Sequence, residues 1–240
     1  MAPSTKSYHE LFVEARALAP TGLPEDSWYI IVAATLLTTE GGAHLGELYL
    51  FLIAALGDEG TLEARRRISR RIRAVIIKAW TLVGMPRASD GFFSLTKVEK
   101  VEDVDMNGDR QRYAADPELA MRRTKAWWAQ VFGEQESSTI LDSYSTNPDF
   151  GWTVDYAVYG LFLADLSVLG PEENELVILS SVMGQGAHFT TITHLRGIRR
   201  IGVSAADTQS VENIIRLVAE HQGKDTSSWH QSQEVAHLFP

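Results

Sequence analysis

The segment SSVMGQGAHFTTITHLRG, residues 180–197, concentrates side chains that could transfer protons. It contains two histidines and three threonines around a glycine-punctuated break, and Glu175 lies nineteen residues before His194 on the preceding predicted helix. A carboxylate beside an imidazole holds it in one tautomer and keeps it basic. We therefore predict that Glu175 and His194 form a general acid/base pair. The alternative is structural: a histidine satisfied by a carbonyl, and a glutamate favoured by the helix dipole.

A second group of residues would line the pocket of such a pair. On a helix over 187–194, Thr190, Thr191 and His194 share one face, since neighbours on a helix surface are three or four residues apart. Tyr159 and Asp165 are polar groups on an apolar predicted helix and need partners. The predicted substrate-binding residues are Trp80, Tyr156, Tyr159, Asp165, Gln185, His188, Thr190 and Thr191. Ordinary packing is the alternative for each.

The composition excludes several kinds of chemistry. The 240 residues include no cysteine, which rules out disulfides, thiolate nucleophiles and zinc–thiolate sites. The seven histidines show neither H-x-x-x-H nor H-E-x-x-H spacing, and no glycine-rich phosphate motif is present. We expect no metal and no cofactor. A net charge of −9 argues against nucleic acid, despite the basic run at 63–73.

No segment predicts a membrane location. The N-terminus lacks the apolar run of a signal peptide, and the most apolar stretch, 28–37, is too short to span a bilayer. We expect a cytoplasmic protein that does not bind membranes.

Helical periodicity extends over almost the whole chain, which predicts an all-α fold.

The segment with Asp103, Asp105 and Asn107 resembles the start of a calcium loop. Ala114 stands where such a loop needs a bidentate glutamate, so we interpret this segment as an acidic connector. Lys78, within VIIKAW, either extends to solvent or is buried with a lowered pKa. The predicted helices are 6–18, 28–38, 45–56, 62–83, 117–132, 152–169, 173–183, 187–196 and 202–223, with a short helix and a loop within 136–151, an irregular segment at 86–116 and a loose tail.

The block ENELVILSSVM, followed by HLRGIRRIGVSAADTQSVENIIRLVA, resembles the carboxymuconolactone decarboxylase and alkylhydroperoxidase-D-like superfamily. It is most similar to the long, two-repeat fungal members, and the resemblance covers most of residues 45–222. It implies one AhpD-like helical bundle over residues 1–240. Its parts would be a first half at about 24–90, a connector at about 91–116, a second half at about 117–222 and a polar tail at 223–240.

The resemblance also implies a range of activities. The peroxidase branch places a C-x-x-C pair between its glutamate and histidine, and those cysteine positions fall on Ala187 and Thr190 here. Peroxidase chemistry therefore does not carry over. The remaining expectation is a cofactor-free acid/base enzyme that decarboxylates, isomerises or cyclises a small natural-product intermediate of fungal secondary metabolism, with Glu175 and His194 as catalytic residues. A homo-oligomer, dimer or trimer, is expected through the apolar stretch 45–56. The alternative is a non-catalytic binding or assembly protein with the same fold.

Overall fold

The computed structural model describes residues 4–106, 110 and 116–238, and this part of the chain is all-α, without a β-strand. The first group of helices surrounds α2, every residue of which is buried. Their bounds are α1 Tyr8–Ala17, α2 Ser27–Thr38, α3 Leu45–Ala55, α4 Leu62–Val83 and α5 Met85–Thr96, with short 3-10 turns at Gly42–His44, Gly57–Glu59 and Val101–Asp103.

Helix α5 corrects the prediction that residues 86–116 are irregular. Gly84 adopts a positive φ of 85° and ends α4. Pro86 then occupies the first turn of a new helix, where a missing N–H costs nothing, instead of ending the old one. Helix α5 continues to Thr96, beyond the expected limit of the first half at about residue 90.

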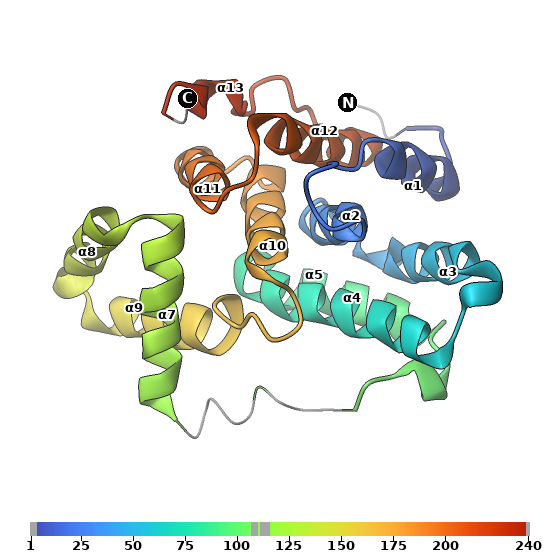
Figure 1. The fold of residues 1–240 in the computed structure, drawn as a ribbon, viewed down its shortest axis with the longest axis horizontal. Coiled ribbons are helices and arrows are strands. Elements are labelled where there is room, and N and C mark those ends of the chain that lie inside the picture. Colours follow the sequence, from blue (N-terminus) through green and yellow to red (C-terminus); the bar gives the residue numbers. More distant parts are fainter. Residues whose placement is uncertain (1–3, 107–109, 111–115, 239–240) are drawn as a thin grey trace.

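The second group begins after the connector and returns to the first group at its end. Its helices are α7 Pro117–Val131, α8 Glu134–Ser143, α9 Pro148–Trp152, the π-helix η5 Thr153–Leu163, α10 Pro171–Gly184, α11 His188–Arg200, α12 Ala205–His221 and α13 Gln233–Ala236, with a 3-10 turn at Tyr144–Thr146. In Figure 1, α10 stands between α7, α9 and α11 on one side and α2 and α4 on the other.

Two predictions in this group were wrong. The helix expected over 152–169 ends at Leu163, and its last eleven residues are wound as a π-helix, with the Ala164 amide donating to the Tyr159 carbonyl at 2.8 Å. The tail expected to be loose is docked. Arg216 donates to the carbonyls of Thr226, Trp229 and His230, and Val235 is buried.

Two hydrophobic clusters hold the helices together. The larger takes buried side chains from α1 to α5 and from α10, α11 and α12. The smaller is built around Trp127, Trp128 and Val131 of α7, with Phe132 at the C-cap of this helix and Leu163 of the π-helix. Helix α10 is buried from Glu173 to Gly184 and contributes to both clusters, so it joins them.

Lys78 of α4 ties three elements together and is fully buried rather than extended to solvent. Its Nζ donates to the Asp165 carbonyl and to Asn174 Oδ1, each at 2.6 Å, and lies 3.1 and 3.3 Å from the Phe162 and Leu163 carbonyls. Burial and nearby guanidinium groups lower the pKa of Lys78. The four oxygen acceptors favour the ammonium form of Lys78. Its N–H groups donate to the carbonyls at and just after the C-terminal end of the π-helix.

The connector aspartates bind arginine and tyrosine side chains of the first group. Asp103 accepts from Tyr49 Oη and Arg65 Nε, each at 2.9 Å, and Asp105 pairs with Arg70 Nε at 2.5 Å. Asn107 and Ala114 lie outside the described residues. In the described part of the chain, no helix is both long and apolar enough to cross a membrane.

Candidate active site

Glu175 and His194 are in direct contact. The Nδ1 atom of His194 lies 2.6 Å from Glu175 Oε1, and both side chains are almost fully buried. Because an ionised carboxylate only accepts hydrogen bonds, Nδ1 carries the proton in this pair. That leaves Nε2 of the neutral ring as the nitrogen able to take a proton from another molecule.

Two helix starts bring these side chains together. Pro171 occupies the first turn of α10 and Glu173 accepts from the Gly170 amide, which places Glu175 in the second turn. After α10, Gly186 adopts a positive φ of 67° and turns the chain into α11, which packs on α10. His194 then lies near the middle of α11.

Gly197 allows α11 to approach the carboxylate. A Cβ atom at this position would lie 2.5 Å from Val131 Cγ1 and 2.9 Å from Glu175 Oε1, which is the oxygen that binds His194. Both distances are shorter than van der Waals contact. The glycine therefore permits the close crossing of α7, α10 and α11.

We expect Gly197→Ala to lower the free energy of unfolding by about 1–3 kcal/mol, the usual cost of overpacking a core. The gain in helix propensity from alanine, about 1 kcal/mol, opposes this loss only in part. Urea denaturation measures the change. Gly170→Ala is the matched control, because its Cβ would meet only Glu172 Oε2, at 3.7 Å. A Gly197→Ala variant as stable as the parent protein would show that the crossing is not tight.

Burial dominates the electrostatics of the pair. It raises the pKa of Glu175, and the charge and hydrogen bond of His194 oppose this shift. The second carboxylate oxygen, Oε2, is buried without a hydrogen-bond partner among the described residues. A buried carboxylate oxygen of this kind is costly unless a water molecule or a ligand satisfies it.

Aromatic rings surround the pair on the side of the smaller cluster. The Phe132 ring meets His194 edge-on at 5.7 Å between centroids, and Trp128 contacts both Phe132 and Tyr159, at 5.5 and 5.0 Å. Burial, and next the Glu175 carboxylate, raise the pKa of Tyr159. Trp128 Nε1 is a buried donor without a partner in the described structure. Among the described residues, the pair therefore has an unused acceptor, and the aromatic cluster that includes Phe132 has an unused donor.

Sequence reasoning missed Trp128 and Phe132. Both rings of the Trp127–Trp128 doublet are buried in the core. The available signal was the apolar spacing at the end of α7, where Trp128 lies one turn before the C-cap residue Phe132. Nothing in the sequence indicated which helix α7 would face.

The other predicted site residues are distributed over several places. Thr191 is buried one turn before His194, and Thr190 is half-buried beside it. Trp80 packs edge-on against Phe162 at 4.9 Å, and Tyr156 stacks on Trp152 at 5.4 Å.

Three further predicted site residues have polar partners of their own. Asp165 is ion-paired with Arg110 and Arg123, each at 3.1 Å. Gln185 donates to the Ser181 carbonyl at 2.9 Å, and His188 Nδ1 lies 3.2 Å from His230 Nε2 of the tail.

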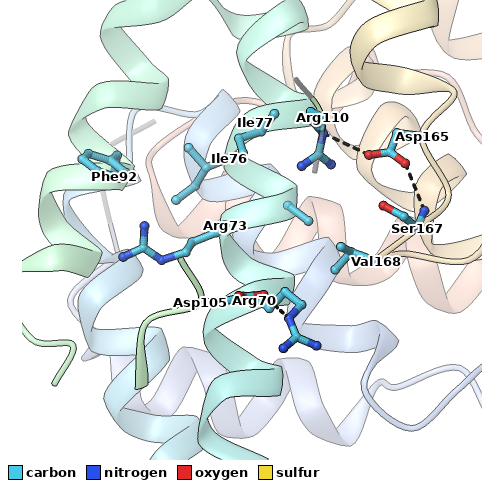
Figure 2. Close-up of a pocket in the computed structure, with 11 residues that line it drawn as sticks. Arg70, Arg73, Ile76, Ile77, Phe92, Asp105, Arg110, Asp165, Ser167 and Val168 are labelled. Carbon is cyan, nitrogen blue, oxygen red and sulfur yellow. Dashed lines mark hydrogen bonds and ion pairs between the residues drawn. The ribbon is translucent and has the colours of Figure 1, made fainter. Parts of the chain in front are cut away.

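The cavities described in the structure do not open onto the pair. A small one of about 10 Å³ is lined by Thr191, Met183, His188 and the tail, which leaves room for about one water molecule. A larger one, about 370 Å³, lies beside α4 and has Asp165 in its wall (Figure 2). Within the described residues, no group of three or more histidine, aspartate or glutamate side chains is arranged to hold a metal ion.

Comparison with known proteins gives one distant relative. Peroxisomal protein 2 of Saccharomyces cerevisiae (strain ATCC 204508 / S288c) is 20% identical over 181 residues, which is 66% of this chain. The chain spans 64% of the length of that curated relative. No family model and no solved structure matches the chain.

Proposed function

We propose that the protein is a cofactor-free acid/base enzyme in which His194 Nε2 exchanges a proton with a small, largely apolar substrate. The observation that carries the proposal is the buried 2.6 Å contact between His194 Nδ1 and Glu175 Oε1. When Nε2 takes a proton from an acidic C–H bond of the substrate, the ring becomes an imidazolium, which the Glu175 carboxylate stabilises. Returning that proton to a different carbon completes an isomerisation. In a decarboxylation, Nε2 takes the proton of the substrate carboxylic acid instead, carbon dioxide leaves, and the imidazolium gives that proton to the resulting carbanion.

The surroundings of the pair support this chemistry. Trp128 Nε1 is an unused donor that could hold a substrate carbonyl, and the aromatic rings exclude water. Positioning and proton transfer would supply the rate, the latter on the order of 10²- to 10⁴-fold. Membership of the AhpD-like superfamily and an organisation as two related halves belong to the same proposal and rest on the block around 175–202.

The alternative function is a non-catalytic binding or assembly protein. Glu175 and His194 are 0% and 2% exposed, and the cavity of about 370 Å³ lies elsewhere. A buried hydrogen-bonded pair that is closed to substrate is a structural element. The absence of cysteine at the peroxidase positions fits this function equally well.

An assay of proton exchange distinguishes the acid/base enzyme from the non-catalytic binding protein. The protein is incubated in D₂O with a panel of small β-keto acids and lactone acids, and NMR follows deuterium incorporation and loss of carbon dioxide. We expect turnover that His194→Gln abolishes and that His9→Gln, at an exposed histidine of α1, leaves unchanged. Full turnover in the His194→Gln variant would reject the assignment. Thermal stabilisation by a panel compound without turnover would favour the binding protein.

The compartment and the assembly are proposals as well. The name of the yeast relative raises the peroxisome as an alternative to the cytoplasm that the sequence predicts. Imaging a fluorescently tagged full-length chain distinguishes the two. A dimer or trimer is expected, and light scattering of the purified protein measures the subunit number.

A further inference from the structure

The cavity of about 370 Å³ beside α4 is separate from the Glu175–His194 pair. Its floor is apolar and comes from Ala74 and Ile77 of α4, with Val168 from the segment that follows the π-helix and Phe92 from α5. Figure 2 shows guanidinium groups around this floor, with Arg73 toward Phe92 and Arg70 below Val168. The volume lies at the lower end of the range for small-molecule sites.

Arg70 and Arg73 supply hydrogen-bond donors at this cavity. Arg70 binds Asp105 only through Nε, and its two terminal amino groups make no hydrogen bond with a described residue. Arg73 binds Glu99 through Nε and Nη2, which leaves Nη1 unused, and its guanidinium lies over the Phe92 ring. The side chain of Arg70 is 39% exposed. A ligand can therefore reach these donors without breaking the existing ion pairs.

The charges around the cavity limit what can bind there. Guanidinium groups bind carboxylates and phosphates through paired N–H donors. Asp105 and Asp165 are in the same wall, however, and would repel a group that carries two or more negative charges. Burial tends to raise the pKa of Asp165, but the Arg110 guanidinium and neighbouring donors outweigh it and hold this pKa below its usual value. The Asp165 carboxylate therefore remains charged. A ligand that carries one negative charge on an apolar body fits both the guanidinium donors and the two nearby carboxylates.

We propose that this cavity is a binding site for a small amphipathic carboxylate, with its carboxylate on Arg70 and its apolar body over Ala74, Ile77 and Val168. The site is independent of the proposed acid/base chemistry, because none of these residues contacts Glu175 or His194 in the described structure. Its ligand need not be a substrate.

Isothermal titration calorimetry with octanoate, 1-octanol and octyl phosphate tests the proposal on the full-length protein. We expect octanoate to bind at least about tenfold more tightly than octanol, since hydrogen bonds to an ionised group are stronger than those to a neutral hydroxyl. Arg70→Gln is expected to weaken octanoate binding about tenfold and to leave octanol binding unchanged. Val168→Trp, which fills the cavity from its apolar floor, is expected to abolish the binding of both.

The matched control is Arg67→Gln, one turn before Arg70 on α4. Arg67 pairs with Asp26 and is not in the cavity wall. Circular dichroism confirms that each variant is folded. The proposal is overturned if octanoate does not bind, if octanol binds as tightly, or if Arg70→Gln and Val168→Trp leave octanoate binding intact. Tighter binding of octyl phosphate than of octanoate would also overturn it, because the ligand would then be a phosphate.

Discussion

His194→Phe is expected to lower the free energy of unfolding by about 3–5 kcal/mol near neutral pH, the usual cost of removing one partner of a buried pair. For a chain of this size the melting temperature falls by roughly 10 °C. The physical reason is that the Glu175 carboxyl group, fully buried, loses the partner that stabilises its charge. Denaturation in urea, followed by circular dichroism, measures the loss.

The pH dependence of this loss identifies its cause. Burial raises the pKa of Glu175 above the ordinary value of 4.5, and loss of His194 removes the contact that opposes the shift. A folded state with a raised carboxyl pKa keeps a proton that the unfolded state releases, so its stability falls as pH rises from 4.5 toward the folded pKa. The His194→Phe variant should therefore approach parental stability at low pH.

A double variant completes the test. Glu175→Leu with His194→Phe removes both polar groups, and we expect it to recover most of the stability that the single variant loses. His188→Phe, at the exposed histidine of the same helix, is the control for the added ring. If the double variant is as unstable as His194→Phe, the loss of stability comes from packing of the phenylalanine and not from the unpaired Glu175 carboxyl group.

Lys78→Met is expected to be the other severely destabilised variant, with a loss of about 3–5 kcal/mol. Methionine fills a similar volume but leaves four buried oxygen acceptors without their donor, including the carbonyls at the end of the π-helix. Thermal unfolding followed at 222 nm detects the loss. Because the ammonium group joins α4, the π-helix and α10, all of these elements should be affected together.

Lys125→Met on α7 is the matched control, since Lys125 is exposed. We expect that variant to change stability by no more than about 0.5 kcal/mol. A Lys78→Met variant close to the parent in stability would mean that Lys78 is neutral and contributes little as a donor. Its acceptors would then need water in place of the ammonium group.

Much of the fold follows from the sequence. The apolar spacing predicted α2, α3, α4 and α12 to within a few residues, and the Ser204 hydroxyl caps α12. One error came from proline, which can follow the end of one helix or begin the next. The prediction placed Pro86 at the start of an irregular segment, and only the positive φ of Gly84 shows that it begins α5.

The site was less predictable than the fold. The nineteen-residue separation of Glu175 and His194 predicted their contact, because both lie on consecutive helices joined by a glycine turn. The roles of Lys78, Gly197 and Trp128 depend on which helix crosses which, and no local pattern encodes that. The π-helix could not be predicted from the sequence either, because its residues have the composition of an apolar α-helix.

The burial of α10 on all sides has a consequence for motion. A helix shared by both hydrophobic clusters cannot open without separating them, so its amide protons should exchange with solvent only through global unfolding. Glu175 is on this helix and is fully buried. An opening that admits a molecule to His194 would therefore come from α7, α11 or the π-helix, and the motion of these elements would set the rate of entry.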